Sequence, residues 1–184
     1  MVAGYESFAK FLVAEQDGKS LSSFRHNKPM SVLVAMPHLT KSFEIKPRDF
    51  LRGGEVSIQV RHILKMIGFS DDVLRRASVC AYESEINVVM YGGPGTLLLI
   101  ADEDMITIEV RDRGEGIEDV EMAMKEGFST STDEYREMGF GAGMGLPNIK
   151  KNADHFEIHS KKGEGTYLKI CVRGEDSSDS SGEK

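Results

Sequence analysis

A carboxylate and an amide four positions apart are the first side chains in this sequence that could do chemistry together. Glu83 and Asn87 fall in an apolar-periodic stretch that ends near Tyr91, where i, i+4 spacing places both on one helical face. An asparagine carbonyl is a hard oxygen donor for a cation such as Mg²⁺, and a carboxylate can act as a general base. Glu85 is a competing carboxylate, but it lies about 160° from Asn87 on the helical wheel. A pair with this spacing is more often part of a solvent-exposed helical face. A functional interpretation of Glu83 and Asn87 therefore depends on the motifs downstream.

The second motif is the turn Asp112-Arg113-Gly114-Glu115-Gly116, which follows an apolar strand. A carboxylate at a strand end can accept a hydrogen bond from an exocyclic amine. Gly114 and Gly116 allow the backbone to turn tightly beside a planar ring. An ordinary turn is the alternative interpretation of this motif alone.

The third motif is a stretch with glycine at alternate positions, Gly139 to Gly145, which opens a predicted helix. Bare backbone amides at a helix N-terminus form an anion site, and the glycines also permit the loop to open and close. A flexible linker is the alternative. The stretch lacks the Gly-Lys-Ser/Thr of a Walker A loop, and no parallel-sheet strand leads into it as in a dinucleotide fingerprint. Downstream, Gly163-Glu164-Gly165-Thr166 predicts a tight turn that enters a strand, and the candidate cationic partners for phosphate are Lys125, Arg136, Lys150 and Lys151.

The elements that must position these motifs follow from apolar periodicity and from turn residues. We expect a strand ending at Pro47, helices over 55–67 and from Ser70 to about Tyr91, a hairpin over 96–110, a short helix over 118–126, a lid over 127–143, a helix over 146–153, and strands over 156–160 and 166–172. Helices and strands segregate in this order and do not alternate as βαβ units. The order predicts an α+β two-layer sandwich with a mixed, mostly antiparallel sheet covered on one face by helices.

The bulk composition limits the classes of partner. A chain of 184 residues with a net charge of −7 lacks the basic character that a sequence-independent grip on nucleic acid or an anionic membrane needs. Its two cysteines, Cys80 and Cys171, are far apart and predict neither a disulfide framework nor a zinc site. No apolar stretch is long enough to span a bilayer and no export signal is evident, so we expect a cytoplasmic protein.

In order and spacing, the Glu-x-x-x-Asn pair, the Asp-x-Gly-x-Gly turn, the glycine-rich lid and the Gly-x-Gly-Thr turn resemble the motif set of the gyrase, heat-shock chaperone, histidine kinase and mismatch-repair (GHKL) ATPase superfamily. The resemblance covers roughly residues 40 to 173. Within that superfamily the chain looks most like the bacterial anti-sigma factors and stress-switch serine kinases, because residues 126–131 (EGFSTS) and 141–147 (GAGMGLP) resemble the switch kinases closely.

The resemblance implies a Bergerat-type ATP-binding fold and a role for each motif. Glu83 would be the general base, Asn87 the Mg²⁺ ligand and Asp112 the acceptor for the adenine amine. Gly114 and Gly116 would lie beside the adenine, and Thr166 would support that end of the pocket. The backbone that would face the phosphates of ATP belongs to Gly141, Gly143, Met144, Gly145 and Leu146.

The expected function is that of an ATP-binding anti-sigma regulatory factor and serine protein kinase that phosphorylates a small antagonist protein in a partner-switching pathway. Catalysis would consist mostly of positioning and charge neutralisation. The alternative is a nucleotide-gated protein that sequesters a sigma factor or another regulator without significant catalysis. A third option is an ATPase module that serves a metabolic or redox complex. The resemblance also implies homodimerisation.

The predicted organisation has an N-terminal arm over 1–39, an ATP-binding kinase domain over 40–173, and a disordered acidic and serine-rich tail over 174–184. The sequence departs from the closest kinases at residues 132–138, which lengthen the lid. Arg136 is also out of register with the arginine that the sporulation-type anti-sigma factors place ahead of their Gly-x-Gly. A phosphoacceptor-histidine helix pair is absent from the sequence, so we do not expect a complete histidine kinase.

Overall fold

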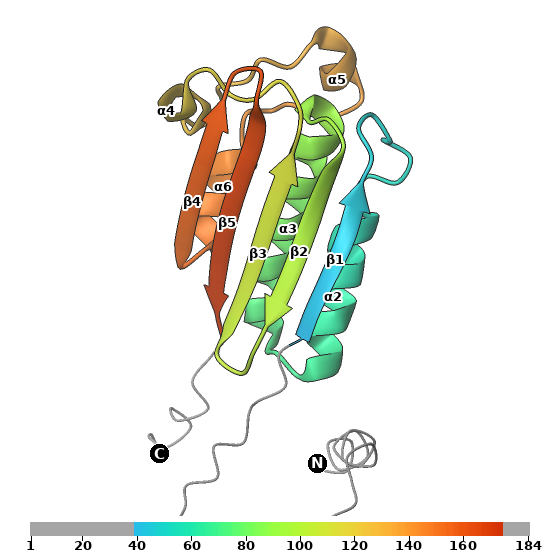
Figure 1. Cartoon of the computed structure of the whole chain (residues 1–184), viewed down its shortest axis with the longest axis vertical. Coiled ribbons are helices and arrows are strands. Elements are labelled where there is room, and N and C mark those ends of the chain that lie inside the picture. The colour runs from blue at the N-terminus through green and yellow to red at the C-terminus, as the bar shows by residue number, and fades with distance from the viewer. Residues whose placement is uncertain (1–38, 175–184) are drawn as a thin grey trace, which may run out of the picture. The chain divides into compact units, whose positions relative to one another are not determined.

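The computed structural model describes residues 39–174, which form a sheet with helices packed on one face (Figure 1). The elements in chain order are β1 (Leu39–Ile45), α2 (Glu55–Ile67), α3 (Asp71–Tyr91), β2 (Gly95–Ala101), β3 (Met105–Asp112), α4 (Val120–Ala123), α5 (Asp133–Glu137), α6 (Gly145–Asn152), β4 (His155–Lys161) and β5 (Gly165–Arg173). Within this part of the chain, no helix has the length and apolar content needed to cross a membrane. The predicted arm, apart from Leu39, and the tail after residue 174 lie outside the described residues.

The sheet has five strands in the order β1-β2-β3-β5-β4. Each of the four neighbouring pairs is antiparallel, so the predicted α+β sandwich is confirmed, while the described strands contain no parallel pair of the kind that a mixed sheet would have. For β1 and β2, the reason for the antiparallel pairing lies in the two helices that connect them. Because α2 and α3 run in opposite directions, they return the chain to the end where β1 finished, and β2 must then run back beside β1 (Figure 1).

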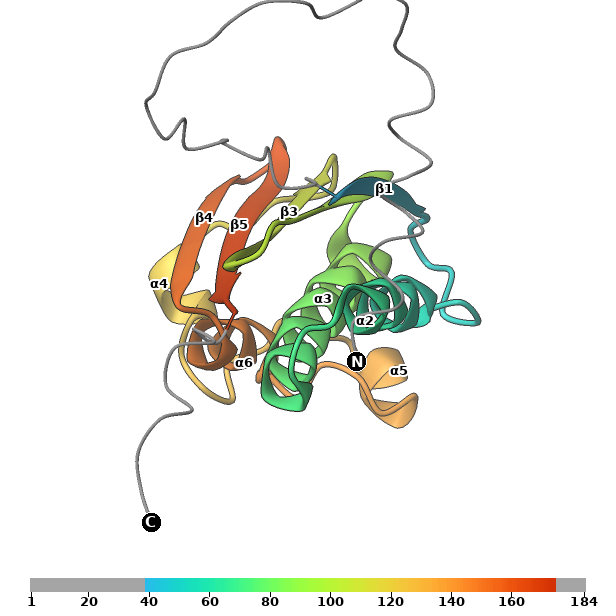
Figure 2. The same ribbon diagram turned by 90° about the horizontal axis from the view of Figure 1, so that it is seen from below.

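The hydrophobic core lies between the sheet and the layer formed by α2, α3 and α6, which Figure 2 shows together on one face. Strand β2 alternates buried and less buried residues, with Leu97 and Leu99 fully buried toward the helices. Helix α3 is the central helix, and small buried residues such as Ala77 and Ala81 let it approach the sheet closely.

The ends of the two long helices agree with the sequence signals. Gly68 ends α2 in the left-handed conformation at φ 100°, and its N–H donates to the carbonyl groups of the last turn. The Ser70 hydroxyl accepts from the Val73 N–H and so caps α3, with Asp71 and Asp72 in the first turn. The predicted bounds of both helices are therefore confirmed.

Two predictions between β3 and α6 were wrong in detail. The short helix expected over 118–126 covers only Val120–Ala123, because Asp119 caps it at one end and Met124 ends it. The segment expected to be a lid without secondary structure contains α5, a five-residue helix. A helix this short is not stable by itself, so its formation depends on contacts with the rest of the domain.

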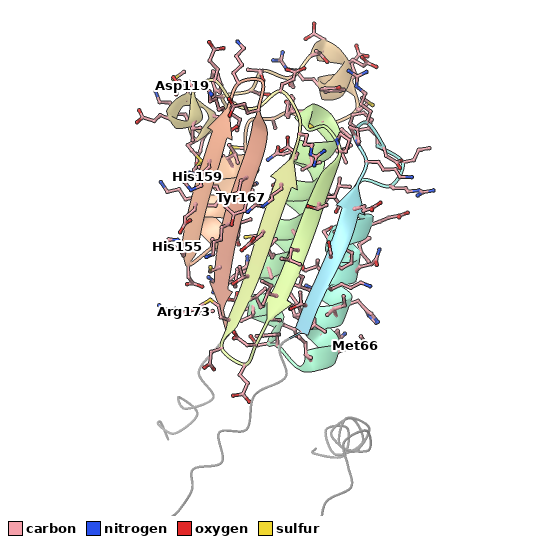
Figure 3. The ribbon with its side chains drawn as sticks, in the orientation of Figure 1. Met66, Asp119, His155, His159, Tyr167 and Arg173 are labelled. Atoms are coloured by element: carbon pink, nitrogen blue, oxygen red, sulfur yellow. The ribbon has the colours of Figure 1, made fainter. Side chains whose placement is uncertain are left out.

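Both of these short helices lie at one end of the sheet, where β3 also ends (Figure 1). Figure 3 shows Asp119 at this end and Met66, near the end of α2, at the other. The loops that carry the predicted motifs therefore gather at the end of the domain marked by Asp119.

Candidate functional site

Glu83 and Asn87 lie on the part of α3 that faces the start of α6. A Cβ atom placed on Gly145 would be 3.3 Å from Asn87 Oδ1 and 3.4 Å from Glu83 Oε2, so both side chains border the first residue of that helix. The other carboxylate oxygen, Glu83 Oε1, accepts a hydrogen bond of 2.7 Å from Asn148 Nδ2. The structure thus brings the predicted base, the predicted cation ligand and the end of the lid together.

Asn148 is a residue of this site that sequence reasoning missed. The only available signal was a polar side chain at the fourth position of the helix that follows the lid. That signal does not specify a partner 65 positions earlier in the chain.

Asp112 is the last residue of β3 and begins the glycine-bearing turn. Its Oδ1 accepts a 2.7 Å hydrogen bond from the Gly114 N–H. Burial raises the pKa of Asp112 above that of an ordinary aspartate, although hydrogen bonds from the backbone N–H groups of Gly114 and Thr166 act in the opposite direction. The half-buried carboxylate thus lies where the predicted Asp112 and Thr166 motifs meet.

Gly116 is required by the backbone around it. Its φ is 68°, and a Cβ there would lie 2.0 Å from the Lys161 carbonyl oxygen. Gly114 is equally confined, because a Cβ at that position would lie 2.5 Å from the Tyr91 carbonyl oxygen. Both predicted glycines therefore permit a tight turn against neighbouring backbone.

Ser160, on β4, links the Asp112 turn to the turn that ends at Thr166. The sequence did not predict this role. Its Oγ accepts from the Ile117 N–H at 2.8 Å and lies 2.8 Å from Thr166 Oγ1. Thr166 thus supports the Asp112 turn through its N–H and through the Ser160 hydroxyl. A serine in a strand carries no sequence signal for this bridging role.

The lid folds back on itself at its glycines. Gly141 and Gly143 have φ values of 76° and 73°. A Cβ on Gly141 would lie 2.2 Å from Ser131 Oγ, and one on Gly143 would lie 2.5 Å from the Gly127 carbonyl carbon. These two lid glycines are therefore needed for close packing within the lid.

The residues at the start of α6 offer backbone groups. Met144 is the N-cap residue, and no side chain caps the helix. The Leu146 side chain belongs to the core, so only its backbone is left for the predicted contact with a phosphate.

Aromatic side chains hold α5 against the domain. The Tyr135 ring lies 5.4 Å from Phe50 and 6.3 Å from Tyr91, measured between centroids, and Phe140 lies 5.6 Å from Phe50. The lengthened part of the lid is thus docked on the β1–α2 loop and the end of α3. We call Phe50, Tyr91, Tyr135 and Phe140 the lid cluster.

The four cationic candidates lie in different segments. Arg136 pairs with Asp133 and donates to Ser131 Oγ, while Lys125 Nζ contacts the Met122 sulfur. Lys150 and Lys151 occupy the last turn of α6, away from its N-terminus. Arg136 and Lys125 are thus engaged near their own positions in the chain, and Lys150 and Lys151 lie at the opposite end of α6 from the lid.

Glu85 has a structural role. Its buried carboxylate accepts hydrogen bonds from the N–H groups of Gly54, Val56 and Ser57 at 3.0, 3.1 and 2.9 Å. These are N–H groups at the start of α2, whose N-cap residue Gly54 has no side chain. The competing carboxylate is thereby assigned to capping α2, and Glu83 is the carboxylate at the start of α6.

The chain is similar to known ATPases and protein kinases. Residues 83–175 match the family described as histidine kinase-, DNA gyrase B-, and HSP90-like ATPase. The chain is 33% identical over 112 residues to the serine/threonine-protein kinase RsbT of Bacillus subtilis, covering 59% of this chain and 78% of that protein. It is 38% identical over 90 residues to the anti-sigma F factor of Caldanaerobacter subterraneus, covering 49% of this chain and 55% of the relative. The anti-sigma F factor of Clostridium acetobutylicum is 30% identical over 97 residues, covering 53% and 60%. The chain therefore belongs to the family of histidine kinase-, DNA gyrase B- and HSP90-like ATPases.

Proposed function

We propose that this chain is an ATP-dependent protein serine kinase that phosphorylates a small antagonist protein in a partner-switching pathway. The observation that carries the proposal is the convergence of Glu83 and Asn87 on Gly145, where the lid joins α6. Membership of an ATPase family supports ATP as the nucleotide. The similarity to a serine/threonine-protein kinase supports a protein as the acceptor of the phosphate.

The two ends of the site suit the two ends of ATP. The Asp112 carboxylate accepts the adenine amine, with Gly114 and Gly116 beside the ring and Thr166 behind the carboxylate. At the other end, the backbone of Gly141, Gly143 and Met144 and the first turn of α6 (Gly145 and Leu146) face the phosphates, where the helix dipole favours negative charge.

Asn87 is the residue that would hold Mg²⁺. Its amide oxygen is a hard donor, and the described residues contain no group of three or more His, Cys, Asp or Glu side chains that could hold a metal by themselves. Such a donor set fits a cation that is bound by few protein oxygens and shares the phosphate oxygens of its nucleotide. When bound, the cation supplies charge neutralisation at the transferring phosphate.

Glu83 accepts the proton in the transfer. The acceptor serine hydroxyl approaches Glu83 Oε2 and gives up its proton there, its oxygen forms a bond to the γ-phosphorus, and the bond from that phosphorus to the β,γ-bridging oxygen breaks to release ADP. The surrounding residues orient the hydroxyl and the triphosphate and exclude water from the transfer.

A second function is favoured by the anti-sigma F factors among the relatives. In this alternative, nucleotide binding gates the sequestration of a sigma factor or another regulator, and catalysis is insignificant. Homodimerisation, which the family resemblance implies, and a cytoplasmic location, which was expected from the sequence, complete the proposal.

The test is a pull-down with and without Mg·ATP, followed by phosphosite mapping on the captured protein and by transfer assays with Glu83→Ala. We expect phosphate on a serine, a transfer rate about 10²- to 10⁴-fold lower in the variant, and retained ATP binding. Glu103→Ala, which alters an exposed carboxylate in the β2–β3 turn, is the control with an unchanged rate. Stable capture of a partner without phosphate incorporation would favour sequestration, and full transfer by Glu83→Ala would remove Glu83 from its role.

A further inference from the structure

We infer that Asn148 is a positioning residue for phosphate transfer, which it serves by holding Glu83 in one orientation; this inference rests on the proposed function. Asn148 Nδ2 donates to Glu83 Oε1 at 2.7 Å in a partly buried setting. One carboxylate oxygen is thereby engaged, and the other, Oε2, borders Gly145 together with the Asn87 amide. The bond thus selects Oε2 as the oxygen that receives the proton.

The backbone of Asn148 is fixed at both of its polar groups. Its N–H donates to the Met144 carbonyl oxygen at 2.8 Å, and its carbonyl oxygen accepts from Asn152 Nδ2 at 2.9 Å. Leu146 and Ile149, on the same helix, are buried in the core. The amide therefore projects from a helix segment that is already held in place.

Helix α6 is also anchored to α3, which carries Glu83. Arg76 Nε donates to the Asn152 carbonyl oxygen at 3.1 Å, and Arg76 pairs with Asp154 at 2.6 Å. Cys80 Sγ lies 3.8 Å from the Ile149 carbonyl oxygen. The separation of Asn148 and Glu83 is consequently set by helix packing, which suits a group that positions another.

The chemistry of an amide matches this task. An asparagine N–H can donate to a carboxylate but does not take up or release a proton near neutral pH, so it does not compete with Glu83 as a base. A glutamate side chain has three rotatable bonds, and a carboxylate without a fixed partner would spend much of its time away from the acceptor hydroxyl. Misplacement of a reacting group by about 1 Å can lower a rate about 100-fold.

The experiment compares the Asn148→Ala and Asn148→Asp variants with the unmutated chain in the transfer assay. We expect kcat to fall about 10- to 100-fold in Asn148→Ala, while the KM values for ATP and for the antagonist change by less than about twofold. Asn148→Asp is expected to fall at least as far, because it replaces the donor with a second carboxylate. Gln59→Ala is the matched control: it removes an exposed side-chain amide from α2, outside the contacts described for Asn148 and Glu83, and should leave kcat within about twofold.

The Glu83→Ala background separates positioning from a general structural role. If Asn148 acts through Glu83, adding Asn148→Ala to Glu83→Ala leaves the residual transfer rate unchanged. A further fall in that background, or a kcat of Asn148→Ala within about twofold of the unmutated protein, would overturn the inference.

A nuclear magnetic resonance measurement tests the inference even if the chain does not transfer phosphate. The side-chain amide signal of Asn148, assigned by its loss in Asn148→Ala, should move in Glu83→Ala and stay in place in Glu103→Ala. No phosphate transfer by the unmutated protein would contradict the proposed function. With that result, a moved signal would still support the positioning of Glu83 by Asn148, and an unmoved signal would overturn it.

Discussion

Glu85→Gln should destabilise the domain far more than its conservative chemistry suggests. The Glu85 carboxylate accepts three backbone hydrogen bonds at the start of α2, of 3.0 and 3.1 Å at Oε1 and 2.9 Å at Oε2. The α2 N-cap residue is Gly54, which provides no side-chain cap. A carboxylate from α3 therefore caps the N-terminus of α2, where a serine or aspartate at the N-cap position usually provides the cap.

The size of the destabilisation follows from how many of the three hydrogen bonds a glutamine amide can still accept. A glutamine oxygen can keep the two bonds at Oε1, but its NH₂ group then faces the Ser57 N–H and leaves that buried donor unsatisfied. An unsatisfied buried N–H costs about 1–3 kcal/mol, and loss of the negative charge at a helix N-terminus adds about 0.3–1 kcal/mol. We therefore expect Glu85→Gln to lower the free energy of unfolding by about 1–4 kcal/mol.

The assay is urea denaturation followed by circular dichroism at 25 °C. Glu83→Gln is the matched control, because it makes the same chemical change two positions earlier, where the carboxylate accepts a bond from a side chain only. We expect that control to change the free energy of unfolding by less than about 1.5 kcal/mol. A Glu85→Gln variant as stable as the unmutated protein would show that the carboxylate is not the cap that α2 depends on.

Two further predictions concern nucleotide binding. Because burial raises the pKa of Asp112 and the carboxylate must be ionised to accept the adenine amine, ATP affinity should fall with decreasing pH at a higher pH than an ordinary aspartate would give. Calorimetric titration with ATP from neutral to acidic pH measures this fall. The Asp112→Asn variant should bind ATP about 10- to 150-fold more weakly and lose the pH dependence. A variant that binds ATP as tightly as the unmutated protein would exclude Asp112 as the acceptor for the adenine amine. Tyr135→Ala should loosen α5, since a ring pair such as Tyr135 with Phe50 contributes about 0.5–1.5 kcal/mol. Hydrogen exchange should then speed up over 132–140 and remain unchanged in β3, whereas unchanged exchange in the lid would show that the lid cluster does not hold it.

The same pKa shift has a defined sign for stability. A carboxylate whose pKa is raised on folding favours the protonated folded state, so acid relieves a cost and does not remove a stabilising interaction. Asp112→Asn is therefore expected to leave the free energy of unfolding near that of the unmutated protein, which separates loss of affinity from loss of fold. Denaturation of this variant at neutral pH is the corresponding measurement.

The sequence by itself determined the elements whose signals are local. The bounds of α2 and α3 follow from apolar periodicity, from Gly68 at the end of one and from Ser70 at the start of the other. The order of strands and helices predicted the α+β sandwich, and the order of motifs predicted the ATPase family. Each of these depends on residues a few positions apart, or on a linear order that needs no knowledge of packing.

Only the tertiary structure decided which side chains meet. Glu83 and Glu85 are two positions apart and chemically identical, yet one contacts Asn148 on α6 and the other caps α2. Periodicity gives the face of a helix on which each carboxylate lies, but not what the neighbouring helix presents to that face. The same holds for α5, which is too short to be stable alone and depends on Phe50 and Tyr91 from distant parts of the chain. These contacts arise from the rotation and register with which elements pack on one core, and a linear sequence does not contain those quantities explicitly.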